Sequence, residues 1–587
     1  MKKFLVCACL FTLAARLVAA EKSFDQFLDS FATEWMRGDP AGSTAFQFFT
    51  GAEQDALDRQ LTPLNREYQL ARVALAKQGL AGLKNFDRAA LSESQRVSAA
   101  MFEWQLEGLV QADTFNDHGF LFNQMFGLHV GLVNFFTQTH PVRNRRDIEN
   151  YLVRLEQVAA LMDEGVSQTK AQGDRGYLMP KFILTAVLGQ FDRFLAGGAH
   201  QNALVTALDE RATGLTDVPA ADRTAFVTAA ENIVAQSVLP AFQRAQALLQ
   251  AQAAVATDDA GLWRLPGGDK AYEHFLRAST TSNFTADQIH EIGLKEVTRI
   301  EGQMDALFRE LGYTEGAINE RFNKLRDDMQ PKEADPRPRL LAEYTAIVRD
   351  AEKRADLLFD LRPKALVEVR REPELTEKNA APHYTLPAPD GSRPGIFWVT
   401  LPGPKFPVVA MRTLSYHEAV PGHAFQLTLQ QEMKDLPRFR RDGIFDFISA
   451  HAEGWALYAE KLAAESGWYE GDKVGRLGQL ASELFRAKRL VVDTGLHAKH
   501  WTRQQAIDYG MPVSEVERYV MMPGQACSYK IGELKILELR AKARQALGEK
   551  FSLKEFHNVV LRTGGVPLAV LEQVIDDYIA SANASAH

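Results

Sequence analysis

The residues best suited to chemistry lie in the segment YHEAVPGHAFQ, where two histidines flank a glutamate. Imidazole nitrogens and carboxylate oxygens are zinc ligands, and a hydrolytic zinc site combines three such ligands with a glutamate that acts as general base. In the H-E-x-x-H signature the two histidines stand one helical turn apart. Here His417 and His423 are six residues apart. In an unbroken helix of about 3.6 residues per turn they would point in different directions.

The residues between the two histidines predict that the helix is not continuous. Pro421 has no amide hydrogen to donate to the carbonyl of His417, and its ring clashes with that carbonyl. Gly422 tolerates backbone angles that other residues avoid. We therefore expect a break or bulge at Pro421-Gly422, a local irregularity that is frequent at functional sites and that would let His423 face His417.

A third ligand is expected from the segment SAHAEGWALYAEKL, where Glu453 lies thirty residues after His423. Gly454 follows it and leaves room for a close approach. Glu460 shares the helical face of Glu453 but lies two turns further along the helix, which makes it the weaker choice. His451 lies on a different side of the same helix and would at most support the ligands. These residues predict a site for one Zn²⁺ ion.

The surrounding sequence indicates the elements that must position this site. From Ser23 to about Gly261 the apolar residues recur at intervals of three or four, which is typical of amphipathic helices, and further helical segments follow residue 410. Residues 382–409 differ, because β-branched and aromatic residues at 384–386 and 396–401 enclose a Pro- and Gly-rich turn. The sequence therefore predicts a mainly α protein with a small β-hairpin beside the metal helix.

The first twenty residues, MKKFLVCACLFTLAARLVAA, are typical of a secretory signal peptide with cleavage near Ala20. We expect an exported protein, periplasmic or secreted. A lipid anchor on Cys9 is not expected, because few apolar residues precede it. Removing this segment leaves Cys527 as the single cysteine and a net charge of −11, which argues against a nucleic-acid partner. The rest of the chain contains no uninterrupted apolar run of membrane-spanning length, so no integral membrane segment is expected.

Four segments, YHEAVPGHAFQ, HAEGWALYAE, RLVVDTGLHAKHW and PGQACSYKIGELKILELR, resemble the bacterial family catalogued as domain of unknown function 885. The resemblance is densest from about residue 380 onward. In arrangement that family is similar to the gluzincin peptidases, such as angiotensin-converting enzyme and the thimet-type oligopeptidases. The resemblance implies a large helical bowl with a deep central cleft, in which a strand ahead of the metal helix binds the peptide backbone. The spacing H-E-x-x-x-x-H is a departure from those peptidases.

Carried onto this chain, the resemblance implies His417, His423 and Glu453 as ligands and Glu418 as the base that takes a proton from the attacking water. Tyr529, which follows a Pro-Gly turn, is the candidate to stabilise the oxyanion, as the related peptidases place a tyrosine after such a turn. A packed core tyrosine is the alternative.

Arg489, Asp493 and His497 recur every four residues on one helical face. They could form an exposed ladder of alternating charge or line the substrate cleft. In the cleft, Asp493 would orient His497, or Arg489 would hold a substrate carboxylate. We expect these side chains to line the cleft.

We therefore expect a signal peptide at 1–20, a helical region at 21–265 and a metallopeptidase-like catalytic region at 266–587, the last two forming one continuous bowl. The expected activity is zinc-dependent hydrolysis of peptide bonds, with short peptides as substrates. Two alternatives remain open: a binding protein on the same scaffold without catalysis, and a zinc amidase or esterase acting on another carbonyl compound. The sequence does not indicate an oligomeric state.

Overall fold

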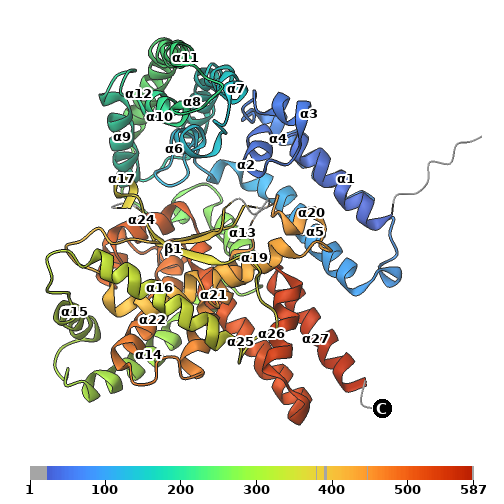
Figure 1. The fold of residues 1–587 in the computed structure, drawn as a ribbon, viewed down its shortest axis with the longest axis vertical. Coiled ribbons are helices and arrows are strands. Elements are labelled where there is room, and N and C mark those ends of the chain that lie inside the picture. The colour runs from blue at the N-terminus through green and yellow to red at the C-terminus, as the bar shows by residue number, and fades with distance from the viewer. Residues whose placement is uncertain (1–22, 378–379, 389–392, 446, 585–587) are drawn as a thin grey trace, which may run out of the picture.

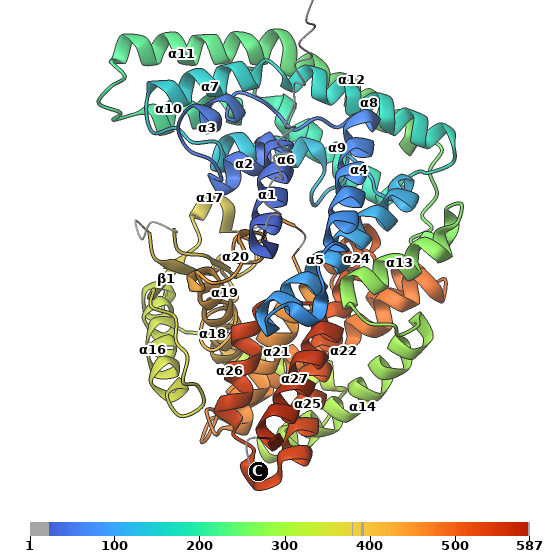
Figure 2. The same cartoon turned by 90° about the vertical axis from the view of Figure 1, so that its right-hand side faces the viewer.

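The computed structural model describes residues 23–377, 380–388, 393–445 and 447–584. Helices make up most of these residues, and the strands form one small sheet, so the prediction of a mainly α fold is confirmed. The predicted signal peptide lies outside the described residues. Figures 1 and 2 show α7 to α12 gathered at one end of the molecule, whereas α5 lies among the later elements, against α27.

The helices before residue 265 form the blue to green part of Figure 1. They are α1 (Phe24–Arg37), α2 (Pro40–Phe46), α3 (Gly51–Leu57), α4 (Arg66–Leu83), α5 (Glu93–Ala112), α6 (Leu128–Asn134), α7 (Arg145–Leu155), α8 (Val158–Asp174), α9 (Lys181–Ala196), α10 (Ala203–Ala212), α11 (Ala220–Ile233) and α12 (Leu239–Ala253). Side-chain caps start several of them; in α1, Ser23 and Gln26 form a reciprocal capping box.

The helices after residue 265 include α14 and α22, the longest uninterrupted α-helices that the structure describes. They are α13 (Gly268–Thr280), α14 (Ala286–Glu310), α15 (Ile318–Asp328), α16 (Arg337–Ala355), α17 (Glu374–Glu377), α18 (Met411–Glu418), α19 (His423–Glu432), α20 (Arg438–Arg441), α21 (Ser449–Glu465), α22 (Lys473–Ala498), α23 (Arg503–Asp508), α24 (Val513–Met521), α25 (Ser528–Leu547), α26 (Leu553–Thr563) and α27 (Leu568–Ala584).

The sheet has three strands in the order β1–β3–β2, with β1 at Val367–Arg371, β2 at His383–Thr385 and β3 at Gly395–Val399. The antiparallel pair β2–β3 is the predicted hairpin, and β1, which the sequence reasoning missed, pairs with β3 in parallel. The strand nearest in sequence to the metal helix, β3, is therefore central and paired on both sides. Only β1 and β2 present an edge of this sheet.

The helices α21 and α25 pack against each other at two glycines. A Cβ atom on Gly454 would lie 2.5 Å from the carbonyl carbon of Gly532, and one on Gly532 would lie 1.9 Å from the oxygen of Ala450. The close approach expected at Gly454 therefore belongs to a neighbouring helix. This contact fixes α21, which carries Glu453, against the core.

The hydrophobic cores are not divided at residue 265. One core joins α1, α4 and α5 to residues of α16, the sheet, α21 and α25 to α27. A second joins α7 to α12 to the end of α22 and to α24. The interior of each core thus combines segments that lie far apart in sequence.

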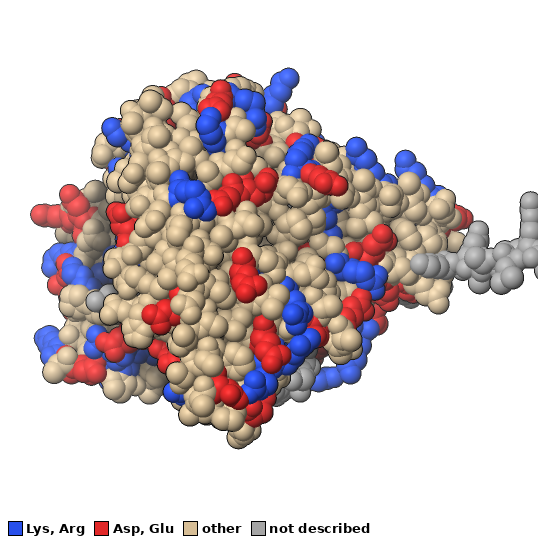
Figure 3. All heavy atoms as spheres, turned by 90° about the horizontal axis from the view of Figure 1, so that it is seen from above, with Lys and Arg blue, Asp and Glu red and all other residues tan. Residues whose placement is uncertain are grey.

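One long helical stretch within the described residues, 220–253, is long and apolar enough to cross a membrane by length and composition alone, with a mean hydropathy of 1.2 in its most apolar window. It comprises α11, a π-helical turn and α12, and α12 packs against α8 and α9. This is weak evidence, and the absence of an integral membrane segment stays a prediction. Figure 3, which views the molecule from this end, shows acidic and basic side chains interspersed over the surface.

Candidate metal centre

The helix that carries His417 ends at the next residue, and a new helix starts at His423. Between them Ala419 has φ −108° and ψ −98°, and Gly422 has φ −80° and ψ −132°, both outside the helical region. A Cβ atom on Gly422 would lie 1.8 Å from the carbonyl oxygen of His417, so the bend requires glycine there. The indole of Trp455 donates a hydrogen bond of 2.8 Å to the carbonyl of Pro421 and holds the bend against α21. The predicted break is confirmed.

The bend brings the two histidines together. Their ring centroids are 4.8 Å apart, and the rings are nearly perpendicular. Glu453 of α21 faces both: its Oε2 lies 3.6 Å from Nε2 of His417 and 3.3 Å from Nε2 of His423. Glu418 completes the group, since ligand-type atoms of His417, Glu418 and His423 lie within 4.8 Å of one another. Four predicted site residues from three helices thus converge.

The two carboxyl groups differ in their electrostatic environment. Burial raises the pKa of Glu418, against the opposing charges of His423, His417 and Arg486. Burial also acts to raise the pKa of Glu453, but the two histidines hold it well below its usual range. One carboxyl is therefore poised to accept a proton and the other to remain an anionic ligand.

Glu460 has a role that the sequence reasoning did not assign. Its Oε1 lies 2.8 Å from Nδ1 of His417, and its side chain is fully buried two turns beyond Glu453 on α21. A carboxylate bonded to the outer nitrogen of a histidine fixes the ring and directs the other nitrogen inward. Although burial acts to lower it, the hydrogen bonds to Glu453 and Glu460 raise the pKa of His417 to about 9. The seven-residue spacing from Glu453 was the available signal.

The donor set fits a zinc ion. With ligand distances of about 2.0–2.2 Å, neighbouring ligand atoms of a tetrahedral site are about 3.3–3.5 Å apart. The two Nε2–Oε2 separations, 3.3 and 3.6 Å, are close to this value. The side chains of His423 and Glu453 are 10% and 15% exposed, so the cluster is not sealed from solvent. His417, His423 and Glu453 are therefore the residues that would hold the metal.

The structure places Asp493 and His497 among other helices. His497 accepts from the amide of Leu262 at Nδ1 (3.1 Å), and its Nε2 lies 3.1 Å from the carbonyl of Tyr519. Both ring nitrogens are therefore used by the backbone, and Asp493 does not orient this ring through a hydrogen bond. Instead Asp493 accepts from the hydroxyl of Tyr272 (2.7 Å), whose ring stacks on His497. Burial raises the pKa of Asp493 to about 7 and lowers that of His497 to about 4.

His451 is also held by the backbone, because its Nδ1 lies 3.1 Å from the carbonyl of Val566, and burial lowers its pKa to about 4. The remaining two predicted residues lie together. The guanidinium of Arg489 stacks on the ring of Tyr529, 4.5 Å from its centroid. Tyr529 is half-buried and follows Gly524, whose φ is +80°. Its role toward the oxyanion stays a prediction.

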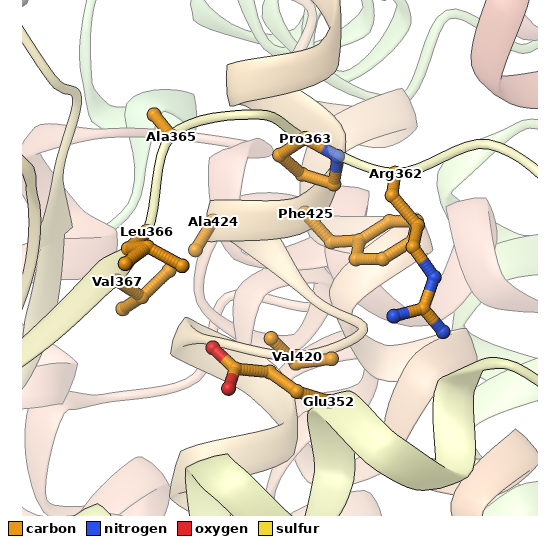
Figure 4. Close-up of a pocket in the computed structure, with 9 residues that line it drawn as sticks. All are labelled: Glu352, Arg362, Pro363, Ala365, Leu366, Val367, Val420, Ala424 and Phe425. Carbon is orange, nitrogen blue, oxygen red and sulfur yellow. The ribbon is translucent and has the colours of Figure 1, made fainter.

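A pocket of about 180 Å³ lies beside the bend of the metal motif (Figure 4). Val420, Ala424 and Phe425 contribute to its wall together with residues 362–367 and Glu352. None of these lining residues is one of the four that converge at the centre. The pocket is therefore distinct from the candidate metal centre.

The fold and the site define a mainly α-helical protein with a buried cluster of two histidines and glutamates that could hold a metal ion. The chain belongs to the family described as bacterial protein of unknown function (DUF885), whose model matches residues 45–575. No match to a curated protein is found.

Two solved structures are similar over nearly the whole chain. The protein from Colwellia psychrerythraea is 31% identical, with a TM-score of 0.86, and the match covers 95% of this chain and 100% of that one. The protein from Shewanella oneidensis is 20% identical, with a TM-score of 0.72, and the match covers 94% of this chain and 100% of that one. Both are described with the words "putative lipoprotein". The second likeness shows the fold alone.

Proposed function

We propose that this protein is a zinc-dependent hydrolase that cleaves peptide bonds, with short peptides as its substrates. The observation that carries the proposal is the convergence of two histidine Nε2 atoms on one oxygen of Glu453, with Glu418 beside them. Two histidines and a glutamate leave one position of a tetrahedral zinc ion for water or substrate.

The residues of the candidate site have separate roles in the proposed reaction. When bound, zinc would polarise the substrate carbonyl and make water a better nucleophile at neutral pH. Glu418 would take the proton of the attacking water and pass it to the leaving amine, and the rise of its pKa on burial makes it a stronger proton acceptor. Glu460 would hold the ring of His417 in place. Tyr529 is the proposed donor to the oxyanion.

The order of elements supports a likeness to the gluzincin peptidases. A small sheet precedes the metal helix, and a glutamate from a later helix faces the histidines, as in that group. Because β3 is paired on both sides, an extended peptide would pair with the free edge of β1 or β2. The wider histidine spacing is accommodated by the bend at Pro421-Gly422.

Two other functions use the same residues. A zinc amidase or esterase would need the same ligands and base, and only the substrate would differ. A binding protein without catalysis would need the scaffold but has no use for a base beside the ligands. The burial of Glu418 against His417 and His423 therefore favours catalysis.

We further propose that the protein is exported. The signal-like sequence of residues 1–20 supports this, and so does the description of the Colwellia relative as a lipoprotein. That description gives no support to the expectation that a lipid anchor is absent. Export and anchoring can be separated by asking whether the mature protein partitions with membranes in its native host.

The decisive experiment measures zinc and hydrolysis in the same preparations. Wild-type protein should bind about one zinc per chain and hydrolyse short peptides. His423→Ala should lose both. Glu418→Gln should keep the zinc and lose about 10²- to 10⁴-fold in rate, the usual contribution of a general base.

His290→Ala is a matched control, because His290 and Glu291 form another His-Glu pair, and His290 is bonded to Thr494. It should behave as wild type. Full hydrolysis by Glu418→Gln would contradict the assigned base. Wild-type protein that takes up no zinc at all would overturn the proposal.

A further inference from the structure

Two arginines of α22, Arg486 and Arg489, have guanidinium nitrogens without hydrogen-bond partners among the described residues. Arg486 and Arg489 project from α22, which packs against both α18 and α21. Arg486 is near enough to Glu418 for its charge to act on that carboxyl. The ring of Tyr529 has the Arg489 guanidinium at 4.5 Å and that of Arg486 at 5.9 Å from its centroid.

The bonds of Arg489 leave one edge of its guanidinium free. Its Nε donates to the hydroxyl of Tyr519 (3.1 Å), and its Nη2 donates to Glu515 (2.9 Å). Its Nη1 is buried and has no hydrogen-bond partner among the residues that the structure describes. Leaving a charged donor unpaired in the interior is costly, and the two anchoring bonds fix the direction of the free edge.

The guanidinium group of Arg486 has still fewer partners than that of Arg489. Its Nη1 donates to the hydroxyl of Ser482 (2.5 Å), and its buried Nε has no partner in the described part of the chain. No carboxylate among the described residues forms an ion pair with it. The hydroxyl of Tyr529 is likewise without a hydrogen bond to any described residue. A cation pair and a free hydroxyl thus gather next to the centre.

We propose that Arg486 and Arg489 bind a carboxylate of the substrate beside the metal centre. This inference rests on the proposed function and narrows its substrates to anionic peptides. Guanidinium groups bind carboxylates with directed, charge-assisted hydrogen bonds. The carboxylate is either the C-terminus of the peptide, which would make the protein a carboxypeptidase-type enzyme, or an acidic side chain.

The test compares N-acetyl-alanyl-phenylalanine as the free acid with its C-terminal amide, by calorimetric titration of the metal-free and the zinc-loaded Glu418→Gln protein. Because charge-assisted hydrogen bonds contribute about 1.5–3 kcal/mol, the acid should bind about 10- to 100-fold more tightly than the amide in both forms. A second pair of C-terminally amidated peptides, one with Asp and one with Asn in place of the alanine, separates a C-terminal carboxylate from a side-chain carboxylate. Only a site for an acidic side chain would bind the Asp peptide more tightly than the Asn peptide.

Arg486→Gln should reduce the preference for the acid to within about threefold, a loss of most of one charged hydrogen bond. Arg489→Lys, which retains the charge but not the fork, should reduce it in part. Lys488→Gln removes a positive charge from the same helix on the side of Glu301 and should leave the preference unchanged. Folding of each variant is checked by its thermal unfolding.

The failures of the two proposals are distinguishable. Equal affinity for acid and amide, or no binding of the acid in either form, would overturn the carboxylate site even if peptides are hydrolysed. A preserved preference for the acid without any hydrolysis by the zinc-loaded wild type would support the carboxylate site and overturn the peptidase.

Discussion

Two clusters of charged residues in the interior share helix α21 and differ in how their charge is balanced. In the first, which we call the Lys530 cluster, Nζ of Lys530 lies 2.6–3.0 Å from Glu533, Glu483 and Glu296. The cluster also contains Arg299, paired with Glu296 and Glu483, and Lys461, 3.6 Å from Glu483. Three carboxylates thus meet three cations. Although burial acts to raise it, these cations lower the pKa of Glu483.

The metal centre contains three glutamates as well, Glu418, Glu453 and Glu460, but no lysine or arginine pairs with them in the described residues. Its two histidines balance the charge only when they are protonated. The carboxylates of the Lys530 cluster are thus paired with its own cations, although Oε1 of Glu533 is buried without a hydrogen-bond partner in the described residues. The metal centre instead has donors and negative charge left for a cation. The first cluster is structural, and the second is a candidate site for a metal ion.

The largest effect on stability is expected from removing the central cation of the Lys530 cluster. Lys530→Met removes the cation shared by three buried carboxylates and should lower the free energy of unfolding by about 3–5 kcal/mol, with or without zinc. Urea denaturation measures it. Lys535→Met, in the more exposed pairs with Glu538 and Glu572, should cost about 0–1 kcal/mol. If Lys530→Met also lowered the free energy of unfolding by only about 0–1 kcal/mol, the pairing of charges in the Lys530 cluster would not be important for stability.

A somewhat smaller effect on stability is expected from adding zinc to the metal centre. Zinc at about 100 times its dissociation constant should raise the free energy of unfolding by about 2.7 kcal/mol, because it binds the folded form. The same addition should leave His423→Ala unchanged. Equal stabilisation of that variant would mean that zinc binds elsewhere.

A smaller effect again is expected from weakening the hydrogen bond between Glu460 and His417. Glu460→Gln retains the shape of the side chain but weakens the hydrogen bond to Nδ1. Loss of such support typically weakens metal binding about 10- to 100-fold. Competition with a chelator measures the affinity, and Glu465→Gln, at an exposed carboxylate that pairs with Arg540, serves as control. Unchanged affinity in Glu460→Gln would argue against its orienting role.

The pH dependence should be the most gradual effect. The raised pKa of His417, about 9, means that zinc must displace a proton below that pH. Zinc affinity should therefore rise with pH, by up to about tenfold per unit, and level off above pH 9. In the metal-free protein the same proton stabilises the fold; this contribution is complete below about pH 6.5 and is lost as the pH rises through 9. A flat affinity between pH 6 and 8 would contradict this protonation.

Much of the centre could be predicted from the sequence because its signals are local. Histidine and glutamate types, a proline that cannot continue a helix and a glycine beside it are properties of a short segment. The spacing of Glu453 and Glu460 follows from helix geometry. The helical class and the hairpin of β2 and β3 follow from the periodicity of apolar residues. For the same reason β1 was missed, since its partner lies about thirty residues away.

Residue types alone could not show which polar residues of α22 have a functional role and which have a packing role. Arg489, Asp493 and His497 share a spacing that fits both a functional and a packing role, and their partners come from α13 and from the chain around residues 515–524. The sequence by itself determined which residues could bind a metal and where the helix must bend. Only the tertiary structure decided that His417, His423 and Glu453 meet, that Glu460 supports them, and that Lys530 neutralises its own cluster. These outcomes depend on contacts between distant segments, whose energies no local pattern contains.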